Sequence, residues 1–204
     1  MKLLSGGQSG VDRAALDVAL ARGIEYSGWC PRGGWAEDFP RPPGLLARYP
    51  KLAETPLADP AQRTEWNVRD ADACLIIVDA EGLSVSRGTV LGRGEAARYG
   101  KPLFVAVLGA AYVAGDAAAW LRAQREGFGE SLTLAIGGPR ESEAPGIRPR
   151  PHLHRRIARA LTRTLPGASS RNSGSNQSQT HCHLLSHPLS VNKGTRGFFG
   201  EPVC

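Results

Sequence analysis

Residues 73–79 read ACLIIVD, a short apolar run rich in β-branched side chains. A run of this length without polar alternation is typical of a strand that is buried on both faces of a sheet. Such strands occur in parallel sheets, whose two faces are covered by helices. The stretch therefore predicts an α/β protein.

The segments on either side of this strand extend the prediction. Further strands are expected over residues 2–5, 24–29, 103–107 and 132–137. Helices are expected over residues 11–22, 61–71, 89–99, 116–126 and 151–165, and residues 30–44 contain too many Pro and Gly for regular structure. Strands that alternate with helices across short loops predict one doubly wound domain over residues 1–166, with a mostly parallel sheet.

Composition sets limits on the class of protein. The chain has 204 residues, of which 41% are hydrophobic, enough for one domain with a core. No apolar run approaches the roughly 18 residues of a membrane helix, and the N-terminus does not resemble a secretory signal. We therefore expect no membrane association and a cytoplasmic location. The four cysteines are widely spaced, which argues against a disulfide framework or a zinc ribbon, and Cys74 is predicted to be a small core residue.

The net charge of +6 is concentrated near the C-terminus. Six arginines fall between residues 148 and 163 without an acid among them: Arg148, Arg150, Arg155, Arg156, Arg159 and Arg163. A solvated basic helix is the preferred interpretation, and nucleic-acid binding through this segment is the alternative. Because the rest of the domain is not basic, nucleic acid is not expected to be the main partner.

Residues 167–204 differ in composition from the preceding domain. Ser, Asn, Gln and Gly dominate, and no periodicity persists, which predicts a disordered tail. The tail contains His181, Cys182, His183 and His187. A metal site needs a fold that holds its ligands in place, so no metal site is predicted there.

Unusual loops follow four of the expected strands. They are SGGQSG (5–10), CPRGGWAED (30–38), AEGLSVSRGT (80–89) and GPRE (138–141). In a parallel sheet the carboxyl ends of the strands share one edge, and open α/β sheets bind their ligands there. The four loops are therefore expected to meet around a common site.

Two of these loops run directly into a helix, namely SGGQSG and SRGT (86–89). Glycine lets backbone N–H groups approach a ligand closely, and a helix N-terminus favours an anion. The pair predicts a phosphate-binding loop and a facing cradle. Neither the dinucleotide pattern GxGxxG nor the Walker pattern GxxxxGK[ST] is present, so tight glycine turns remain the alternative.

Other residues of these loops have two possible roles. Arg13, Arg32 and Arg140 could bind an anion or form surface ion pairs. Trp35 could stack on a planar ring, whereas Trp66, in the middle of a helix, is predicted to be a core residue. The acids Asp12, Glu37 and Asp38 could bind hydrogen-bond donors of a ligand or pair with arginines. On the helix 61–71, Glu65 and Arg69 are spaced for an i,i+4 ion pair.

Taken together, several motifs resemble the putative molybdenum carrier family. They are GGQSGVDRAALD (6–17), GWCPRGGWAED (28–38), ET (54–55), RTEWNVRDAD (63–72), SRGT (86–89) and GPRESEAPGI (138–147). This family is a branch of a Rossmann-like superfamily that includes lysine-decarboxylase-like proteins and lonely-guy phosphoribohydrolases. The similarity spans roughly residues 2–165. It implies a Rossmann-like fold that binds a phosphorylated, ring-containing ligand, with molybdenum cofactor (molybdopterin) or a nucleotide as the cofactor.

The sequence departs from the phosphoribohydrolase branch at one position. That branch resembles PGGxGTxxE, and its glutamate serves the reaction. Here Gly88-Thr89 is followed by Val90-Leu91-Gly92, so a glycine stands in place of the acid. Binding is therefore favoured over catalysis, and no catalytic residue is assigned.

The leading hypothesis is a binding or carrier protein for a small phosphorylated ligand. The alternatives are a nucleotide-processing enzyme with Glu37, Asp38 or Glu95 as its acid, and an ADP-ribose-like nucleotide sensor; the fold also suggests a homo-oligomer. The predicted binding residues are Gly6, Gly7, Gln8, Ser9, Gly10 and Arg13 for phosphate, Ser86, Gly88 and Thr89 for the facing cradle, Arg32, Gly33, Gly34, Trp35 and Glu37 around the ring, and Gly138, Arg140 and Glu141 on the far side.

Overall fold

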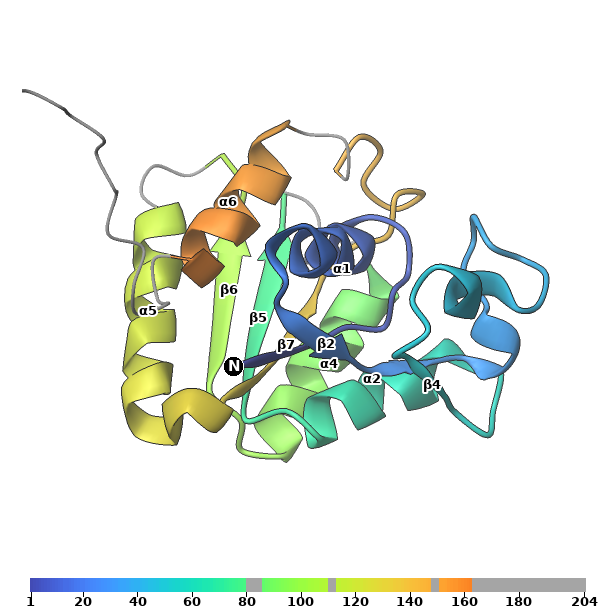
Figure 1. Cartoon of the computed structure of the whole chain (residues 1–204), viewed down its shortest axis with the longest axis horizontal. Helices are drawn as coiled ribbons and strands as arrows, with labels where there is room; N and C mark the ends of the chain where they lie inside the picture. The colour runs from blue at the N-terminus through green and yellow to red at the C-terminus, as the bar shows by residue number, and fades with distance from the viewer. Residues whose placement is uncertain (80–85, 110–112, 148–150, 163–204) are drawn as a thin grey trace, which may run out of the picture. The chain divides into compact units, whose positions relative to one another are not determined.

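The computed structural model describes residues 1–79, 86–109, 113–147 and 151–162, which form a five-stranded parallel sheet with helices on both faces (Figure 1). The strands of the sheet are β1 (Lys2–Leu4), β2 (Glu25–Ser27), β5 (Ala73–Val78), β6 (Leu103–Val107) and β7 (Thr133–Gly137). The helices are α1 (Val11–Arg22), α2 (Pro60–Arg69), α4 (Arg87–Arg98), α5 (Val113–Phe128) and α6 (Pro151–Thr162). The predicted α/β class is confirmed.

The order of the strands across the sheet is β2-β1-β7-β5-β6. The last strand of the sheet in sequence, β7, lies between β1 and β5, and each neighbouring pair is parallel. In register, Leu3 lies beside Tyr26 on one side and Leu134 on the other. The carboxyl ends of β1, β7 and β5 are therefore adjacent at one edge.

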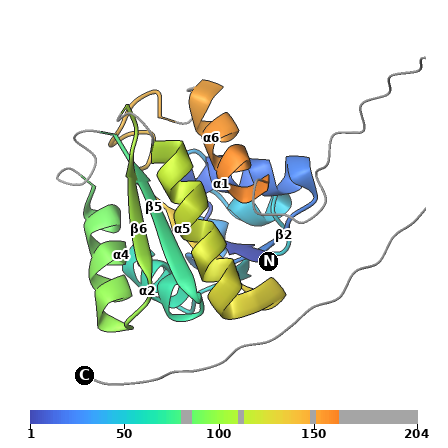
Figure 2. The ribbon, with the colours of Figure 1, turned by 90° about the vertical axis from the view of Figure 1, so that its left-hand side faces the viewer.

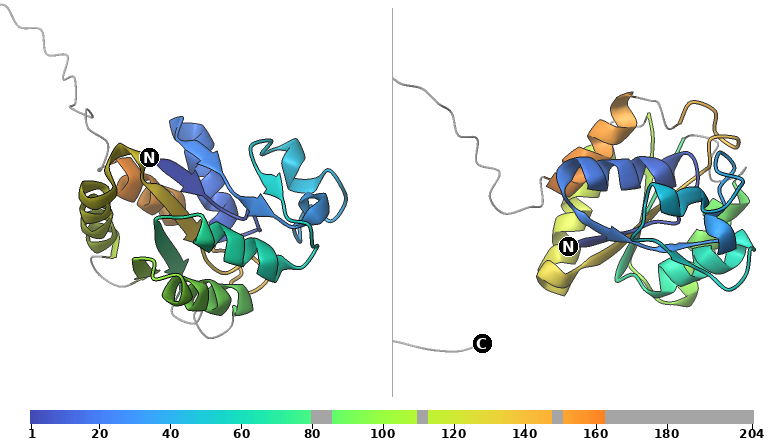
Figure 3. Two further views of the ribbon diagram at one scale, coloured as in Figure 1. Left: turned by 90° about the horizontal axis from the view of Figure 1, so that it is seen from below. Right: turned by 45° about the vertical axis from the view of Figure 1, so that its right-hand side comes forward.

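The connections explain which face each helix covers. From β1 through α1 to β2 the chain moves toward one edge of the sheet, and from β5 through α4 to β6 it moves toward the other. Right-handed crossovers in opposite directions place α1 and α4 on opposite faces. By the same rule α5 shares a face with α1, and α2 shares a face with α4. Seen from below, the sheet lies between α1 and the α2/α4 pair (Figure 3), and Figure 2 shows α5 and α6 on the α1 side.

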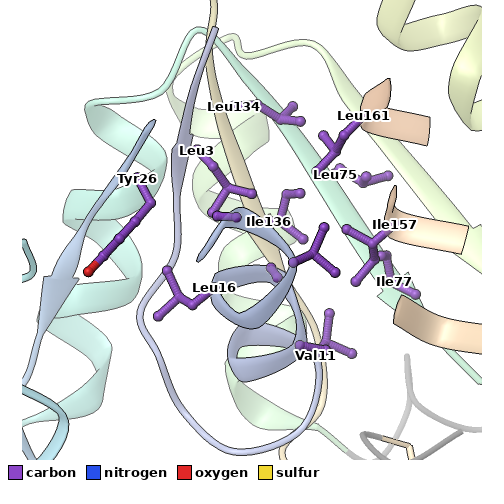
Figure 4. Packing of buried hydrophobic residues seen from close by; sticks show 14 of the residues in the cluster. Leu3, Val11, Leu16, Tyr26, Leu75, Ile77, Leu134, Ile136, Ile157 and Leu161 are labelled. Carbon is purple, nitrogen blue, oxygen red and sulfur yellow. The ribbon is translucent and has the colours of Figure 1, made fainter. Parts of the chain in front are cut away.

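The two layers of core are built from side chains of different size. On the face covered by α1, α5 and α6, the strands contribute Leu3, Leu75, Ile77, Leu134 and Ile136, as Figure 4 shows. On the face covered by α2 and α4, the buried cluster consists of Leu4, Val68, Ala71, Cys74, Ala96 and Ala135. Alternate residues of each strand supply the two layers. Cys74 is buried in the second layer, as the sequence predicted.

The segment between β2 and α2 is more regular than the sequence predicted. Strand β3 (Trp29–Cys30) pairs in parallel with β4 (Ala53–Glu54), and 3₁₀ turns form at Arg32–Gly34 and Gly44–Ala47. The expected strand over 24–29 is divided at Gly28, whose φ is 139°. A Cβ there would lie 2.3 Å from the carbonyl oxygen of Ser5, so the backbone turns away from the sheet where only glycine fits.

The predicted pair between Glu65 and Arg69 is wrong. Glu65 instead accepts hydrogen bonds from Arg98, the last residue of the neighbouring α4, at 3.2 Å and from the hydroxyl of the following Tyr99 at 2.9 Å. Arg69 pairs with Asp70, at 2.7 Å. Tertiary contacts between α2 and α4 thus replace the local pair.

Some of the predictions fall outside the described residues. These are the disordered tail, its histidines and Cys182, and the side chains of Arg148, Arg150, Arg156 and Arg163. Arg155 and Arg159 of α6 are exposed. Within the part of the chain that the structure describes, no helix combines the length and the apolar character needed to cross a membrane.

Candidate functional site

A cleft lies at the carboxyl edge of β1, β7 and β5, and its space of about 640 Å³ includes open solvent. Chain segments that follow these three strands form its mouth: the loop 5–10, the start of α4 and the segment 137–143. The connections that follow β1 and β5 run toward opposite edges of the sheet, which leaves a crevice between them. Open α/β sheets bind ligands in such a crevice.

Glycines allow the loops that follow β1 and β7 to approach each other. Gly10 has a φ of 78°, and a Cβ there would lie 2.3 Å from the carbonyl oxygen of Pro139. A Cβ on Gly138 would lie 2.2 Å from the carbonyl oxygen of Ile77 and 2.8 Å from a methyl of Val11. The contacts with the carbonyl oxygens of Pro139 and Ile77 involve backbone atoms, which cannot move aside as a side chain can. The shape of this wall therefore depends on glycine at 10 and 138.

Asp12, in the first turn of α1, occupies the position where the sequence predicted an anion. Its carboxyl group accepts hydrogen bonds from the backbone N–H groups of Gln8 and Gly138 and from Arg63. The Ser9 N–H donates to the side chain of Gln8 at 3.0 Å. The donors of the predicted phosphate loop at Gln8 and Ser9 thus have protein acceptors.

Arg63 of α2 reaches across the cleft to this carboxyl group. Its Nη1 lies 2.8 Å from Oδ2 of Asp12, and the two side chains are 13% and 3% exposed. Burial raises the pKa of Asp12 above its ordinary value, against the opposing effect of Arg63 and of the two backbone donors. The Nε of Arg63 is buried without a hydrogen-bond acceptor, so one donor at the cleft wall is unsatisfied.

The opposite wall begins with α4. Ser86 caps the helix: its Oγ accepts from the N–H of Thr89 at 3.2 Å and from the hydroxyl of Thr89 at 2.8 Å. Gly88, the second residue of α4, lines the cleft, and a Cβ built there meets no atom of the described residues within 4 Å. The first turn of α4 therefore faces open space, in contrast to the first turn of α1.

Behind the cleft, Glu37 joins three segments. Its carboxylate accepts from the hydroxyl of Ser9 and, at 3.2 and 2.6 Å, from the N–H and hydroxyl of Ser142. The Ser9 Oγ in turn accepts from the N–H of Glu141 at 3.0 Å. Partial burial opposes ionisation, but the hydrogen bonds from Ser142 and Ser9 outweigh it and lower the pKa of Glu37. We call these contacts the Glu37 network.

A pH-dependent effect follows from this network. Because the pKa of Glu37 is lower in the folded state, its contribution to stability is present above the unfolded value of about 4.3 and is lost as the pH falls through the folded pKa. We expect Glu37→Gln to lower the free energy of unfolding by about 1 kcal/mol at pH 7, and the difference from wild type to shrink below pH 4. Urea unfolding at both pH values measures it. The exposed Glu25, replaced by Gln, is the control; a difference for Glu37→Gln that does not change with pH would contradict the prediction.

Arg13 serves the architecture rather than the cleft. Its side chain is 0% exposed and forms two hydrogen bonds of 2.9 Å with Asp38. Its Nε donates to the carbonyl of Gly7 at 3.0 Å, and the guanidinium lies over the rings of Phe39 and Tyr49. Arg13 thus ties α1 and the loop 5–10 to the segment that contains Asp38.

The residues predicted to surround a ring lie elsewhere. Arg32 is exposed, and its N–H donates to the carbonyl of Leu57 at 3.2 Å. The N–H of Gly33 donates to Glu54 of β4, and a Cβ on Gly34 would lie 2.4 Å from the carbonyl oxygen of Pro43. Trp35 is half-buried. This segment packs on its own neighbours and does not line the cleft.

The predicted site residues therefore fall into two groups, those that line the cleft and those that do not. Among the predicted residues, those that line the cleft are Gly6, Gln8, Ser86, Gly88, Thr89, Gly138 and Arg140. Those that do not line it are Gly7, Ser9, Gly10, Arg13, Arg32, Gly33, Gly34, Trp35, Glu37 and Glu141. The segments after β1 and β7 and the start of α4 meet at the cleft, whereas the loop after β2 does not line it. Residues 80–85 of the predicted loop after β5 lie outside the described residues.

Sequence reasoning missed part of the wall. Helix α2 contributes Arg63, Thr64 and Asn67, and the segment after β7 contributes Glu143, which pairs with Arg140 at 3.4 Å. Asn67 hydrogen-bonds the backbone of Trp29 and thereby fixes β3 beside α2. One sequence feature indicates that polar residues of α2 face the site. Arg63 and Asn67 are four residues apart, on one side of a helix that also contains the buried Val68.

Within the described ranges, no group of three or more His, Cys, Asp or Glu side chains could hold a metal ion. The acids that line the cleft, Asp12 and Glu143, are each paired with an arginine. The cleft thus presents paired charges and backbone donors at its mouth.

Comparisons with known proteins agree with the α/β fold described above. The model of the Circularly permutated YpsA SLOG family matches residues 3–160. The fold is similar to the crystal structure of a putative molybdenum carrier protein from Syntrophus aciditrophicus SB, with a TM-score of 0.63 and 34% sequence identity. That similarity covers 80% of this chain and 94% of the other. A search of curated proteins found no match.

Proposed function

This chain belongs to the Circularly permutated YpsA SLOG family, and from that premise we propose that its cleft binds a small phosphorylated ligand as a binding or carrier protein. The ligand's phosphate would lie at the first turn of α4, near Ser86, Gly88 and Thr89. Arg140, across the mouth of the cleft, would supply a positive charge.

The observation that carries this proposal is the difference between the two helix N-termini at the cleft. The first turn of α1 contains Asp12, whose carboxyl group already accepts from the N–H groups of Gln8 and Gly138, so a second anion there would meet like charge. The N-terminus of α4 has no acid in its first turn and faces open space at Gly88. A helix N-terminus with accessible N–H groups favours an anion.

Molybdenum cofactor is the cargo that the similar protein's name suggests. It is a pterin that carries a phosphate, so it needs an anion site and space for a planar ring. The cleft supports both needs, because the start of α4 and apolar residues of the sheet both line it. The buried, unsatisfied Nε of Arg63 offers a donor for an acceptor atom. We therefore propose molybdenum cofactor as the first candidate ligand and a nucleotide as the second.

The acids named for an enzymatic alternative have other roles. Glu37 holds its hydrogen-bond network, Asp38 pairs with Arg13, and Glu95 pairs with Arg98 at 3.0 Å. None of the three lines the cleft. Binding is therefore proposed in preference to hydrolysis of a nucleotide.

Native mass spectrometry and thermal unfolding test the proposal together. We expect protein purified from its own host to retain a phosphorylated compound. Added 6-hydroxymethylpterin phosphate, AMP or ADP-ribose should raise the free energy of unfolding by about 2.7 kcal/mol at 100 times the dissociation constant. If no small molecule is retained and none of these compounds shifts the unfolding transition, the proposed function is wrong.

A further inference from the structure

The layer between the sheet and helices α2 and α4 is built from small residues beside an open cleft. On this face the strands present Cys74 and Ala135, where the opposite face presents Leu75 and Leu134. Protein interiors are normally filled to crystal-like density. The cleft reaches into this layer, because Leu4, Val68, Cys74 and Ala135 are all among its lining residues.

Helix α4 faces the same space with glycine. Gly88 and Gly92 are four residues apart on one side of the helix, and both line the cleft. A Cβ built on Gly92 would touch only a methyl of Thr64, at 3.6 Å, which is an ordinary contact. The missing side chain therefore reflects available room and not a backbone clash.

Glycine inside a helix costs about 1 kcal/mol relative to alanine, and an unfilled apolar space costs further stability. Both destabilising features, the helical glycines and the unfilled apolar space, are located at the cleft. We infer that the small-residue layer is a ring-binding slot, in which a planar heteroaromatic ring lies between the sheet and helices α2 and α4. This inference rests on the proposed function, because the phosphate at the start of α4 would form the outer end of the same ligand.

The geometry sets the orientation of the ligand. The lining has two kinds of surface: polar groups from Arg140, Ser86 and Asp12, and apolar side chains from Leu4, Val68, Ile76 and Ala135. A phosphate stays near water and charge, and the faces of a heteroaromatic ring gain from apolar contact. We therefore place the ring against the apolar lining and the phosphate against the polar lining. The segment that contains Trp35 does not cover it.

Two glycines of α4 provide a matched test. Gly92→Leu places an apolar side chain in the slot, whereas Gly94→Leu places the same side chain on the exposed side of the helix, where a Cβ meets nothing within 4 Å. Both variants replace a helical glycine, so both should fold at least as stably as wild type. We expect the affinity for AMP and 6-hydroxymethylpterin phosphate to fall at least tenfold in Gly92→Leu and to be unchanged in Gly94→Leu.

Methyl NMR with adenine and pterin, which lack phosphate, separates this inference from the proposed function. We expect these rings to shift the methyl signals of Leu4, Val68 and Ile76 in wild type and Gly94→Leu, but not in Gly92→Leu. If the rings shift none of these methyls in wild type, or shift them equally in Gly92→Leu, the slot is not a ring site, whatever the phosphorylated compounds do. If the rings bind as expected but phosphorylated compounds bind no more tightly, the slot stands and the anion site at α4 fails.

Discussion

Replacing Arg13 with alanine is expected to destabilise the protein by about 3 kcal/mol or more, a large part of the 5–15 kcal/mol typical of a domain. The side chain is fully buried, and its removal takes away two donors to Asp38 and one donor to the carbonyl of Gly7. It also removes the cation that lies between the rings of Phe39 and Tyr49. Urea unfolding at neutral pH measures the loss.

Arg48 provides the control for this prediction. It pairs with Asp17 at 2.7 Å and lies over the ring of Tyr49, but its side chain is 48% exposed. Arg48→Ala should cost no more than about 1 kcal/mol, as is usual for surface pairs. Equal losses for the two alanine variants would show that burial of Arg13 does not matter, and the structural role assigned to it would be wrong.

Placing a carboxylate at the start of α4 is expected to weaken the binding of a phosphorylated ligand at least tenfold, or about 1.4 kcal/mol. Gly88→Glu puts the new charge where a side chain has open space, at the mouth of the cleft. An acid in the first turn of a helix stabilises that helix, so the variant should fold normally. Calorimetric titration with 6-hydroxymethylpterin phosphate and AMP measures the effect.

Gly88→Gln has nearly the same size and shape without the charge. It should retain more affinity than Gly88→Glu, and raising the salt concentration should narrow the difference because salt screens exposed charges. If the two variants bind equally weakly, the effect is steric. If both bind as wild type does, the phosphate does not lie at the start of α4.

The sequence predicted those features that depend on local pattern and on the general rules of parallel sheets. The apolar run at 73–79 and its neighbours gave the α/β class, because buried strands and amphipathic helices differ in period. The meeting of the segments after β1 and β7 with the start of α4 followed from the shared carboxyl edge of a parallel sheet. Seven of the predicted residues line the cleft for this reason, among them Gly6, Gly88 and Gly138.

The features that the sequence could not supply depend on tertiary partners. Asp12 and Arg63 are 51 residues apart, and only the packing of α2 across the end of β1 brings them together. On the proposed function, that pair disfavours a ligand anion at the N-terminus of α1 and leaves the start of α4 for it. In the same way, Glu65 pairs with α4 and not with Arg69, because a neighbouring helix offers Arg98 and Tyr99.

The loop after β2 is an exception to the rule that loops which follow parallel strands meet at one edge of the sheet. It was expected to cover a ring with Arg32–Trp35, but the chain turns aside at Gly28, and β3 pairs with β4 beyond the main sheet. Its motif is nonetheless connected to the site, since Glu37 binds Ser9 and Ser142 behind the cleft. The motif residues at 37 and 38 thus hold the walls together in this structure.

The most direct measurement is the position of an oxyanion in crystals soaked with tungstate, whose anomalous signal locates it without assumptions about the ligand. We expect a peak within hydrogen-bonding distance of the Gly88 N–H, on the side of the cleft that faces Arg140. A peak at residues 6–10 beside Asp12, or none in the cleft, would contradict the claim that the start of α4 is the anion end of a binding site.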